Sequence, residues 1–139
     1  MILLDTNVVS ELMKPAPAQS VARWVAAQPA TGVYTSSITE AEILLGIMLL
    51  PVGRRRNAIQ TAAEAMFAED FAGRILAFGS DAARFYARIG AERRRAGQPI
   101  SHFDAQIAAI ARSAGASIAT RNVADFDGCG VKVINPWET

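Results

Sequence analysis

Residues 1–12 read MILLDTNVVSEL, so the first apolar run of the chain, Ile2–Leu4, ends directly on a carboxylate, Asp5. Such a run is typical of a short buried strand. The Thr6-Asn7 pair that follows can cap a helix beginning at about Val8. This stretch therefore predicts a strand-to-helix unit with an acidic side chain at the end of the strand.

The rest of the chain repeats this alternation of strand and helix. Strands are expected at residues 2–4, 32–37, 73–78, 117–120 and 131–135, and helices at 8–13, 18–28, 37–50, 54–70, 81–95 and 104–115. The alternation predicts an α/β fold whose parallel sheet is covered by helices on both faces. In that architecture, binding sites gather beyond the carboxyl ends of the strands, where Asp5 falls.

The length and composition limit what the protein can be. A chain of 139 residues, 51% of them hydrophobic, can bury its own core, so residues 1–139 are expected to form one domain. No segment has the pattern of a signal peptide or of a membrane span, which predicts a cytoplasmic protein without membrane contact. The single cysteine and the single histidine exclude a Cys/His zinc cluster and a two-histidine nuclease site. Any chemistry has to come from carboxylates.

Positive charge gathers in one part of the chain. Residues 54–95 hold nine arginines against five acids, although the net charge of the whole chain is only +1. The planar guanidinium suits phosphate groups, and Arg93, Arg94 and Arg95 form one of the two runs of three arginines in this segment. A solvated helix face explains the same pattern equally well.

Four further residues beside Asp5 carry the candidate chemistry: Glu42, Asp104, Asn122 and Asp125. Glu42 stands in a helical stripe of apolar residues and is expected to be buried, which is rare for Glu unless it is paired or bound to metal. Asp104 is expected to turn toward the interior from its own helix. The alternatives are structural: Asp5 can cap a helix, Asp104 can favour a helix N-terminus, and Asp125 can stabilise a turn.

Carboxylates that converge without matching lysines repel one another, and a bound cation removes that repulsion. Oxygen ligands favour Mg²⁺ or Mn²⁺ over zinc. Such ions support phosphodiester hydrolysis without a protein nucleophile. The residues therefore predict a metal-dependent site for phosphoryl transfer.

Four segments together resemble the PIN-domain ribonucleases, specifically the toxins of VapBC-type toxin–antitoxin pairs and their FitB-like branch. These are MILLDTNVVSEL, TSSITEAEILLGI, FDAQIAAIARSAGASIATRNVADF and VINPW, and the resemblance spans essentially the whole chain. It implies a three-layer α/β/α sandwich around a parallel sheet of four or five strands. It also implies an endoribonuclease site that uses Mg²⁺ or Mn²⁺.

By position in these motifs, the resemblance makes Asp5, Glu42 and Asp104 the metal-binding catalytic acids. Thr6, Asn7 and Thr120 then fall where the family has supporting residues, and many relatives have Asp in place of Asn122, which leaves open whether Asn122 or Asp125 completes the site. The arginines at 93–95 become candidates for RNA contact.

Three further expectations come from the resemblance: a small cognate antitoxin as partner, a homodimer, and contact with the antitoxin near the apolar helix at residues 38–50. A phosphatase of the haloacid dehalogenase type is excluded, because it needs a second Asp where this chain has Asn7. The remaining alternative is a non-catalytic protein that keeps the fold and binds an antitoxin or RNA without cutting.

Overall fold

The computed structural model, which describes residues 1–139, is built around one sheet of five parallel strands. The strands are β1 (Ile2–Leu4), β2 (Val33–Ser36), β3 (Ile75–Leu76), β4 (Ser117–Ala119) and β5 (Val133–Ile134). The helices are α1 (Thr6–Leu12), α2 (Gln19–Ala26), α3 (Ser37–Met48), α4 (Arg54–Ala65), α5 (Ser80–Arg95) and α6 (His102–Ala114). Short helical turns are η1 (Ala30–Gly32), η2 (Met66–Asp70), η3 (Val123–Phe126) and η4 (Pro136–Glu138). The predicted α/β class with a parallel sheet is confirmed.

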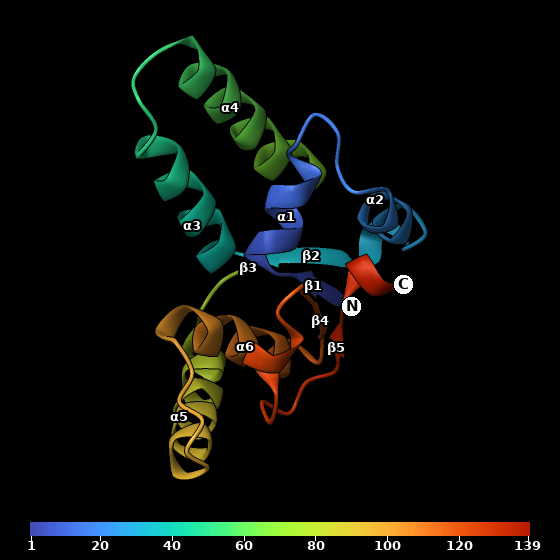
Figure 1. The fold of residues 1–139 in the computed structure, drawn as a ribbon. Helices are drawn as coiled ribbons and strands as arrows, with labels where there is room; N and C mark the ends of the chain where they lie inside the picture. Colours follow the sequence, from blue (N-terminus) through green and yellow to red (C-terminus); the bar gives the residue numbers. More distant parts are fainter.

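Helices cover both faces of the sheet, which gives the sandwich its three layers (Figure 1). Successive side chains of a strand point to opposite faces, so neighbouring leucines of β1 enter different cores. Leu3 packs in a cluster with residues of α5 and α6, whereas Leu4 packs in a second cluster with residues of α1, α2, α3 and α4. None of the helices combines the length and the apolarity that crossing a bilayer requires.

The strand order β3-β2-β1-β4-β5 places a topological switch point between β1 and β4. From β1 the chain moves through β2 to β3 on one side, and α5 and α6 then carry it across to β4 on the other side. Connections that leave neighbouring strands in opposite directions open a crevice at the carboxyl ends of those strands. Asp5 follows β1 and Thr120 follows β4, so both lie at this crevice.

Helix α3 begins at Ser37, as predicted, and its cap is Ser36, the last residue of β2. Ser36, whose backbone is extended, accepts a hydrogen bond at its Oγ from the backbone N of Thr39, 3.1 Å away. Likewise Asp5 itself, and not the Thr6-Asn7 pair, precedes the first turn of α1. Each run of polar residues, Ser36-Ser37 and Asp5-Thr6-Asn7, offers more than one possible helix cap. In both cases the first residue of the run is the cap.

Burial along α3 also differs from the expectation of a helix that is covered on nearly every side. Thr39, Ile43 and Ile47 form its buried stripe. The stripe that contains Glu42 instead runs on to Leu45 and Leu49, and both leucines are exposed. Glu42 therefore lies half-buried at the edge of the crevice and not inside a core.

Candidate active site

The crevice between β1 and β4 is closed at its base by a contact between Asp5 and Thr120. Thr120 Oγ1 donates to Asp5 Oδ2 at 2.8 Å, and the backbone N of Thr6 donates to Asp5 Oδ1 at 2.8 Å. The backbone N of Asp5 donates to Ala119 O at 2.9 Å, which continues the sheet to the edge of the site. Asp5 therefore both caps α1 and presents a fixed carboxylate to the crevice, so the structural role and the proposed chemical one coexist.

Asn7 holds Thr120 in place from the other side. Its Nδ2 donates to Thr120 Oγ1 at 3.2 Å, and its Oδ1 accepts from the backbone N of Arg121 at 3.2 Å. Thr120 Oγ1 also accepts from the backbone N of Asn122 at 3.1 Å. The Thr120 hydroxyl is thus fully used, with one donated and two accepted bonds, and Asn7 and Thr120 serve Asp5 by fixing its orientation.

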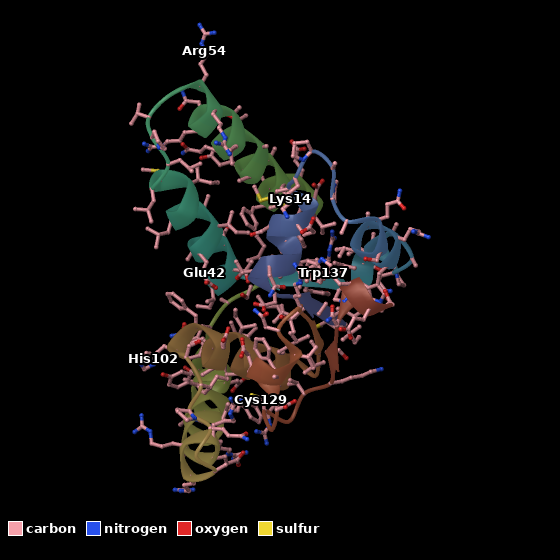
Figure 2. The ribbon with its side chains drawn as sticks, in the orientation of Figure 1. Lys14, Glu42, Arg54, His102, Cys129 and Trp137 are labelled. Atoms are coloured by element: carbon pink, nitrogen blue, oxygen red, sulfur yellow. The ribbon has the colours of Figure 1, made fainter.

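Glu42 reaches the same crevice from the second turn of α3. Thr6 Oγ1 donates to Glu42 Oε1 at 2.8 Å and lies 3.1 Å from Thr39 Oγ1. Because the single hydroxyl proton of Thr6 goes to Glu42, Thr39 must be the donor in the second contact. Figure 2 shows Glu42 on the part of α3 that lies next to the end of α6 bearing His102. The Thr6 side chain therefore connects α1 with α3.

Asp104 enters from the first turn of α6, which begins two residues earlier than predicted and has Ser101 as its cap. Ser101 Oγ accepts from the backbone N of Asp104 at 3.2 Å. The Asp104 side chain is half-buried, and this burial raises the pKa of its carboxyl above the usual value, as does the charge of Asp125. Asp104 is thus under the influence of a second acid beside it.

The electrostatics of Asp5 show how closely the acids approach one another. Burial raises the pKa of the Asp5 carboxyl to about 6, against the hydrogen bonds from Thr120 and Thr6, which lower it. The charges of Asp104 and Glu42 raise the pKa further. No Lys or Arg forms a salt bridge with any of these acids, since the single salt bridge in the chain joins Lys14 to Glu11 at 2.9 Å. Negative charge at the crevice is therefore uncompensated by direct ion pairs.

The outer part of the candidate site, formed by Asn122 and by Asp125 on η3, is more open. Asn122 and Asp125 are both exposed, and neither side chain makes a hydrogen bond within the chain. The structural role proposed for Asp125, a side-chain bond that stabilises the turn, is thus not observed. Its carboxylate faces the acidic crevice closely enough to raise the pKa of Asp104.

Arg93 does not belong with Arg94 and Arg95, and this part of the expected RNA-contact cluster needs correction. Arg93 is only 8% exposed. Its Nε donates to Gln98 O at 2.6 Å, and its Nη1 donates to Asp125 O at 2.9 Å and to Asp127 O at 2.8 Å. A guanidinium engaged in this way is not available to a ligand. Arg93 instead ties the C-terminal end of α5 to the loop that carries Asp125.

The sequence contained a signal for this role that the charge pattern obscured. Ala82, Ile89 and Arg93 are the buried residues of α5, so Arg93 continues the helical stripe that faces the core. Arg94 and Arg95, by contrast, are exposed and line an open groove of about 400 Å³ between α5 and α6. Thr39 was the other functional neighbour that sequence reasoning missed, because a buried threonine inside a helix looks like ordinary core.

Whether these residues fit a metal ion can be judged from their chemistry and spacing. Every candidate donor is an oxygen, which suits Mg²⁺ or Mn²⁺. No three His, Cys, Asp or Glu side chains are spaced to ligate one ion directly. Mg²⁺ keeps several of its waters and usually takes only one or two carboxylates directly. The site therefore fits such a hydrated ion and does not fit an ion that needs a complete protein cage.

Comparisons of the sequence and of the structure with known proteins identify the same family. The model of the PIN domain family matches residues 2–127. The chain is 42% identical over 138 residues to the VapC ribonuclease Y4jK of Sinorhizobium fredii, with 99% of each chain covered. It is 40% identical over 137 residues to Toxin FitB of Neisseria gonorrhoeae, again with 99% of each covered. The crystal structure of FitAcB from Neisseria gonorrhoeae superposes with a TM-score of 0.94 at 40% identity and covers 100% of both chains.

Proposed function

The chain belongs to the PIN-domain family, and on that premise we propose that it is a Mg²⁺- or Mn²⁺-dependent endoribonuclease, the toxin of a VapBC-type toxin–antitoxin pair. Relatives about 40% identical over the whole chain are a VapC ribonuclease and a toxin, which supports both the RNA-cleaving activity and the toxin role. Its partners are an RNA substrate and a cognate VapB-like antitoxin. Its site of action is the cytoplasm, where cellular RNA lies.

One observation supports the site assignment above the others. Asp5, Glu42 and Asp104 come from three different elements, the end of β1, α3 and α6, and Glu42 and Asp104 still lie close enough for their charges to raise the pKa of the Asp5 carboxyl. Carboxylates that lie together repel one another when they are ionised, and a bound cation offsets that repulsion. We assign Asp5, Glu42 and Asp104 as the catalytic and metal-binding acids, with Asn122 and Asp125 at the outer edge of the site.

In this proposal the neighbouring residues of the protein mainly hold the catalytic carboxylates in position. Thr120 and the Thr6 backbone hold the Asp5 carboxylate, the Thr6 hydroxyl holds Glu42, and Asn7 keeps Thr120 from rotating. When bound, the ion supplies Lewis-acid activation of water and neutralises charge on the phosphodiester. Fixed carboxylates lose little conformational freedom on binding the ion, which favours a precise site.

The surrounding surface provides the remaining parts of the proposal. Arg94 and Arg95, both exposed on the last turn of α5, are proposed to contact RNA phosphates. We further propose that residues 1–139 act as one domain and that two copies form a homodimer. The antitoxin is expected to contact the region around α3 and α4.

The test is cleavage of a labelled RNA with and without metal. With Mg²⁺ or Mn²⁺, wild-type protein should cut, and chelation with EDTA should stop the reaction. Glu42→Gln and Asp104→Asn should each reduce the rate on the order of 100-fold or more, because a positioned group of this kind typically contributes at least that factor. Glu40→Gln, the same change on the same helix, is the matched control and should cut like wild type.

Two results would contradict the proposal in different ways. If Glu42→Gln cuts as fast as wild type with metal present, the catalytic assignment of Glu42 is wrong. If wild-type protein binds an antitoxin but never cuts RNA under any metal condition, the protein is a non-catalytic member of the family.

A further inference from the structure

Three arginines of this chain lie over aromatic rings. The guanidinium carbons of Arg88 and Arg112 lie 5.6 Å and 5.1 Å from the centre of the Phe85 ring, and that of Arg121 lies 5.0 Å from the centre of the Trp137 ring. The first two pairs belong to α5 and α6 alone. The third joins the end of β4 to η4 near the C-terminus, and it is the one that stands beside the acidic crevice.

Arg121 is tied to the crevice through its backbone. It directly follows Thr120, which bonds Asp5, and its own backbone N donates to Asn7 Oδ1 at 3.2 Å. Its side chain is exposed and forms no salt bridge, although its charge is close enough to contribute to a lowered pKa of Glu11. Arg121 therefore carries a positive charge without a salt bridge on the residue that follows Thr120; this charge acts on Glu11 and is not among the charges that shift the pKa of Asp5 or of Asp104.

Trp137 supplies a fixed platform for that charge. The backbone N of Trp137 donates to Asn135 Oδ1 at 3.0 Å, and Pro136 beside it is buried. The Trp137 ring is half-buried against the core cluster that contains residues of α1 and α2, and Figure 2 shows Trp137 on η4, next to α2. A ring held in this way restricts a guanidinium that would otherwise sample many rotamers.

The contact with Trp137 leaves the arginine able to bind a ligand. A cation–π contact uses the face of the guanidinium or its charge, whereas the N–H donors point outward from its edge. Those donors match the spacing of phosphate oxygens. In addition, a polyanion that approaches three carboxylates is repelled, and a neighbouring fixed cation offsets that repulsion.

We propose that Arg121 contacts a phosphate of the RNA next to the one being cut, and that Trp137 is the positioning residue that holds the Arg121 guanidinium over the path of the strand. This inference rests on the proposed ribonuclease function. It adds a second phosphate-binding point, because Arg121 lies over Trp137, which packs against the cluster containing α1 and α2, whereas Arg94 and Arg95 lie on α5. The strand then runs across the crevice between cations on both sides.

The experiment measures binding separately from cleavage. A fluorescein-labelled single-stranded RNA of about 12 nucleotides is titrated with protein in EDTA at several KCl concentrations, and affinity is followed by anisotropy. Removing one arginine that binds a phosphate should reduce the slope of log affinity against log salt by about 0.7. Arg121→Gln should show this reduction, and Arg121→Lys should largely keep the slope while binding more weakly than wild type.

Two further variants isolate the roles of the ring and of charge in general. Trp137→Leu should weaken RNA binding with Arg121 still present, and Trp137→Phe should restore part of the affinity because it keeps an aromatic face. Arg88→Gln is the matched control, because it removes an exposed arginine from an aromatic ring elsewhere on the chain, and it should leave the slope unchanged. In cleavage assays with Mg²⁺, Arg121→Gln should raise KM several-fold with little change in kcat.

The outcomes separate this inference from the proposed function. If wild-type protein cuts RNA but Arg121→Gln keeps the wild-type salt slope, or Arg88→Gln shows the same reduction, the inference fails and the ribonuclease assignment stands. If Arg121→Gln instead lowers the affinity for Mn²⁺, measured by calorimetry, without changing the slope, Arg121 serves the acids and not the RNA. If wild-type protein does not cut RNA, the proposed function itself fails.

Discussion

The two ends of α3 show how one helix can serve two unlike purposes. At its N-terminal end the polar groups are engaged: Ser36 accepts from the Thr39 backbone, and the Thr6 hydroxyl joins Thr39 to Glu42. At its C-terminal end large apolar side chains face solvent, and Leu49 is 76% exposed. The first end is closed by the protein's own hydrogen bonds, and the second is left uncovered by this chain.

This difference indicates that the two ends of α3 have different roles. Buried and half-buried polar groups are costly unless they are bonded, so the network at the N-terminal end fixes the Glu42 carboxylate in one place. Exposed apolar residues that cluster, here Leu45, Met48, Leu49 and Val52, are typical of a surface that another protein covers. Changes at one end should therefore alter chemistry, and changes at the other should alter association.

The largest effect is expected at the apolar end. If the proposed homodimer forms through this end of α3, replacing Leu45 and Leu49 together with Asp should convert it to a monomer, because two charges per protomer would have to be buried without partners in the interface. The fold should change little in stability, within about 0.5 kcal/mol, since both side chains are exposed. Molar mass from light scattering coupled to gel filtration measures the first effect, and urea denaturation measures the second.

Ala58→Asp, an exposed position on α4, is the control for added negative charge, and it should leave the mass of the assembly unchanged. A double variant that still has the mass of a dimer would show that the dimer forms through another surface. Wild-type protein that is monomeric at micromolar concentration would leave the apolar end free for the antitoxin alone.

At the polar end, the next largest expected effect is a dependence of the free energy of unfolding on pH, which arises because Asp5 is buried in its ionised form. Its pKa of about 6 in the folded protein lies above the ordinary value of 3.8. The folded state thus binds a proton more tightly than the unfolded chain, and metal-free protein should become more stable as the pH falls from about 7 toward 4. A shift of about two pKa units corresponds to about 3 kcal/mol, so Asp5→Asn should be more stable than wild type at neutral pH by up to about this amount.

Urea denaturation of both proteins in EDTA at several pH values measures this difference. The comparison matters because the pKa of Glu11 shifts in the opposite direction to that of Asp5, and the contribution of Glu11 cancels when the variant is subtracted from wild type. The contribution of Asp104 cancels only in part, because its charge acts on Asp5. If Asp5→Asn is less stable than wild type at every pH, the hydrogen bonds from Thr120 and Thr6 outweigh the burial of charge. Asp5 would then be a capping residue that the structure needs.

The same comparison shows what the sequence could and could not predict. The end of β1 and the end of β4 were identifiable as one site, because carboxyl ends of parallel strands meet at one edge, and the contact between Asp5 and Thr120 confirms their proximity. Glu42 was expected in a buried stripe, and that reason was wrong: it reaches the crevice by standing on the open stripe of α3. A helix with apolar residues on every side gives no periodicity from which to tell its two faces apart.

Arg93 shows a second limit. A run of three arginines looks like one cluster in sequence, but successive residues of a helix point about 100° apart, so only one of the three turns inward. What made Arg93 a buried residue is a set of backbone carbonyls more than 30 positions later in the chain, at residues 125 and 127. Contacts of that separation depend on the tertiary fold, which the spacing of residues within one segment does not encode.

The smallest effect concerns how far the polar end of the site extends beyond its three acids. Asn122 can offer an amide oxygen to a metal but no charge, whereas the Asp125 carboxylate is free, exposed and close enough to act on Asp104.

Arg93 fixes the backbone of Asp125 and Asp127 equally, so Asp127→Asn is a matched control for the removal of a charge. If Asp125 supplies charge to the ion directly or through water, Asp125→Asn should weaken Mn²⁺ binding by about tenfold, the lower end of the range of roughly 10- to 100-fold that is typical of residues one step removed from a metal. Asn122→Ala should weaken it less, and Asn122→Asp should tighten it. Calorimetric titration with Mn²⁺ decides between the cases: an Asp125→Asn variant that binds like wild type and loses only thermal stability would confine the site to Asp5, Glu42 and Asp104.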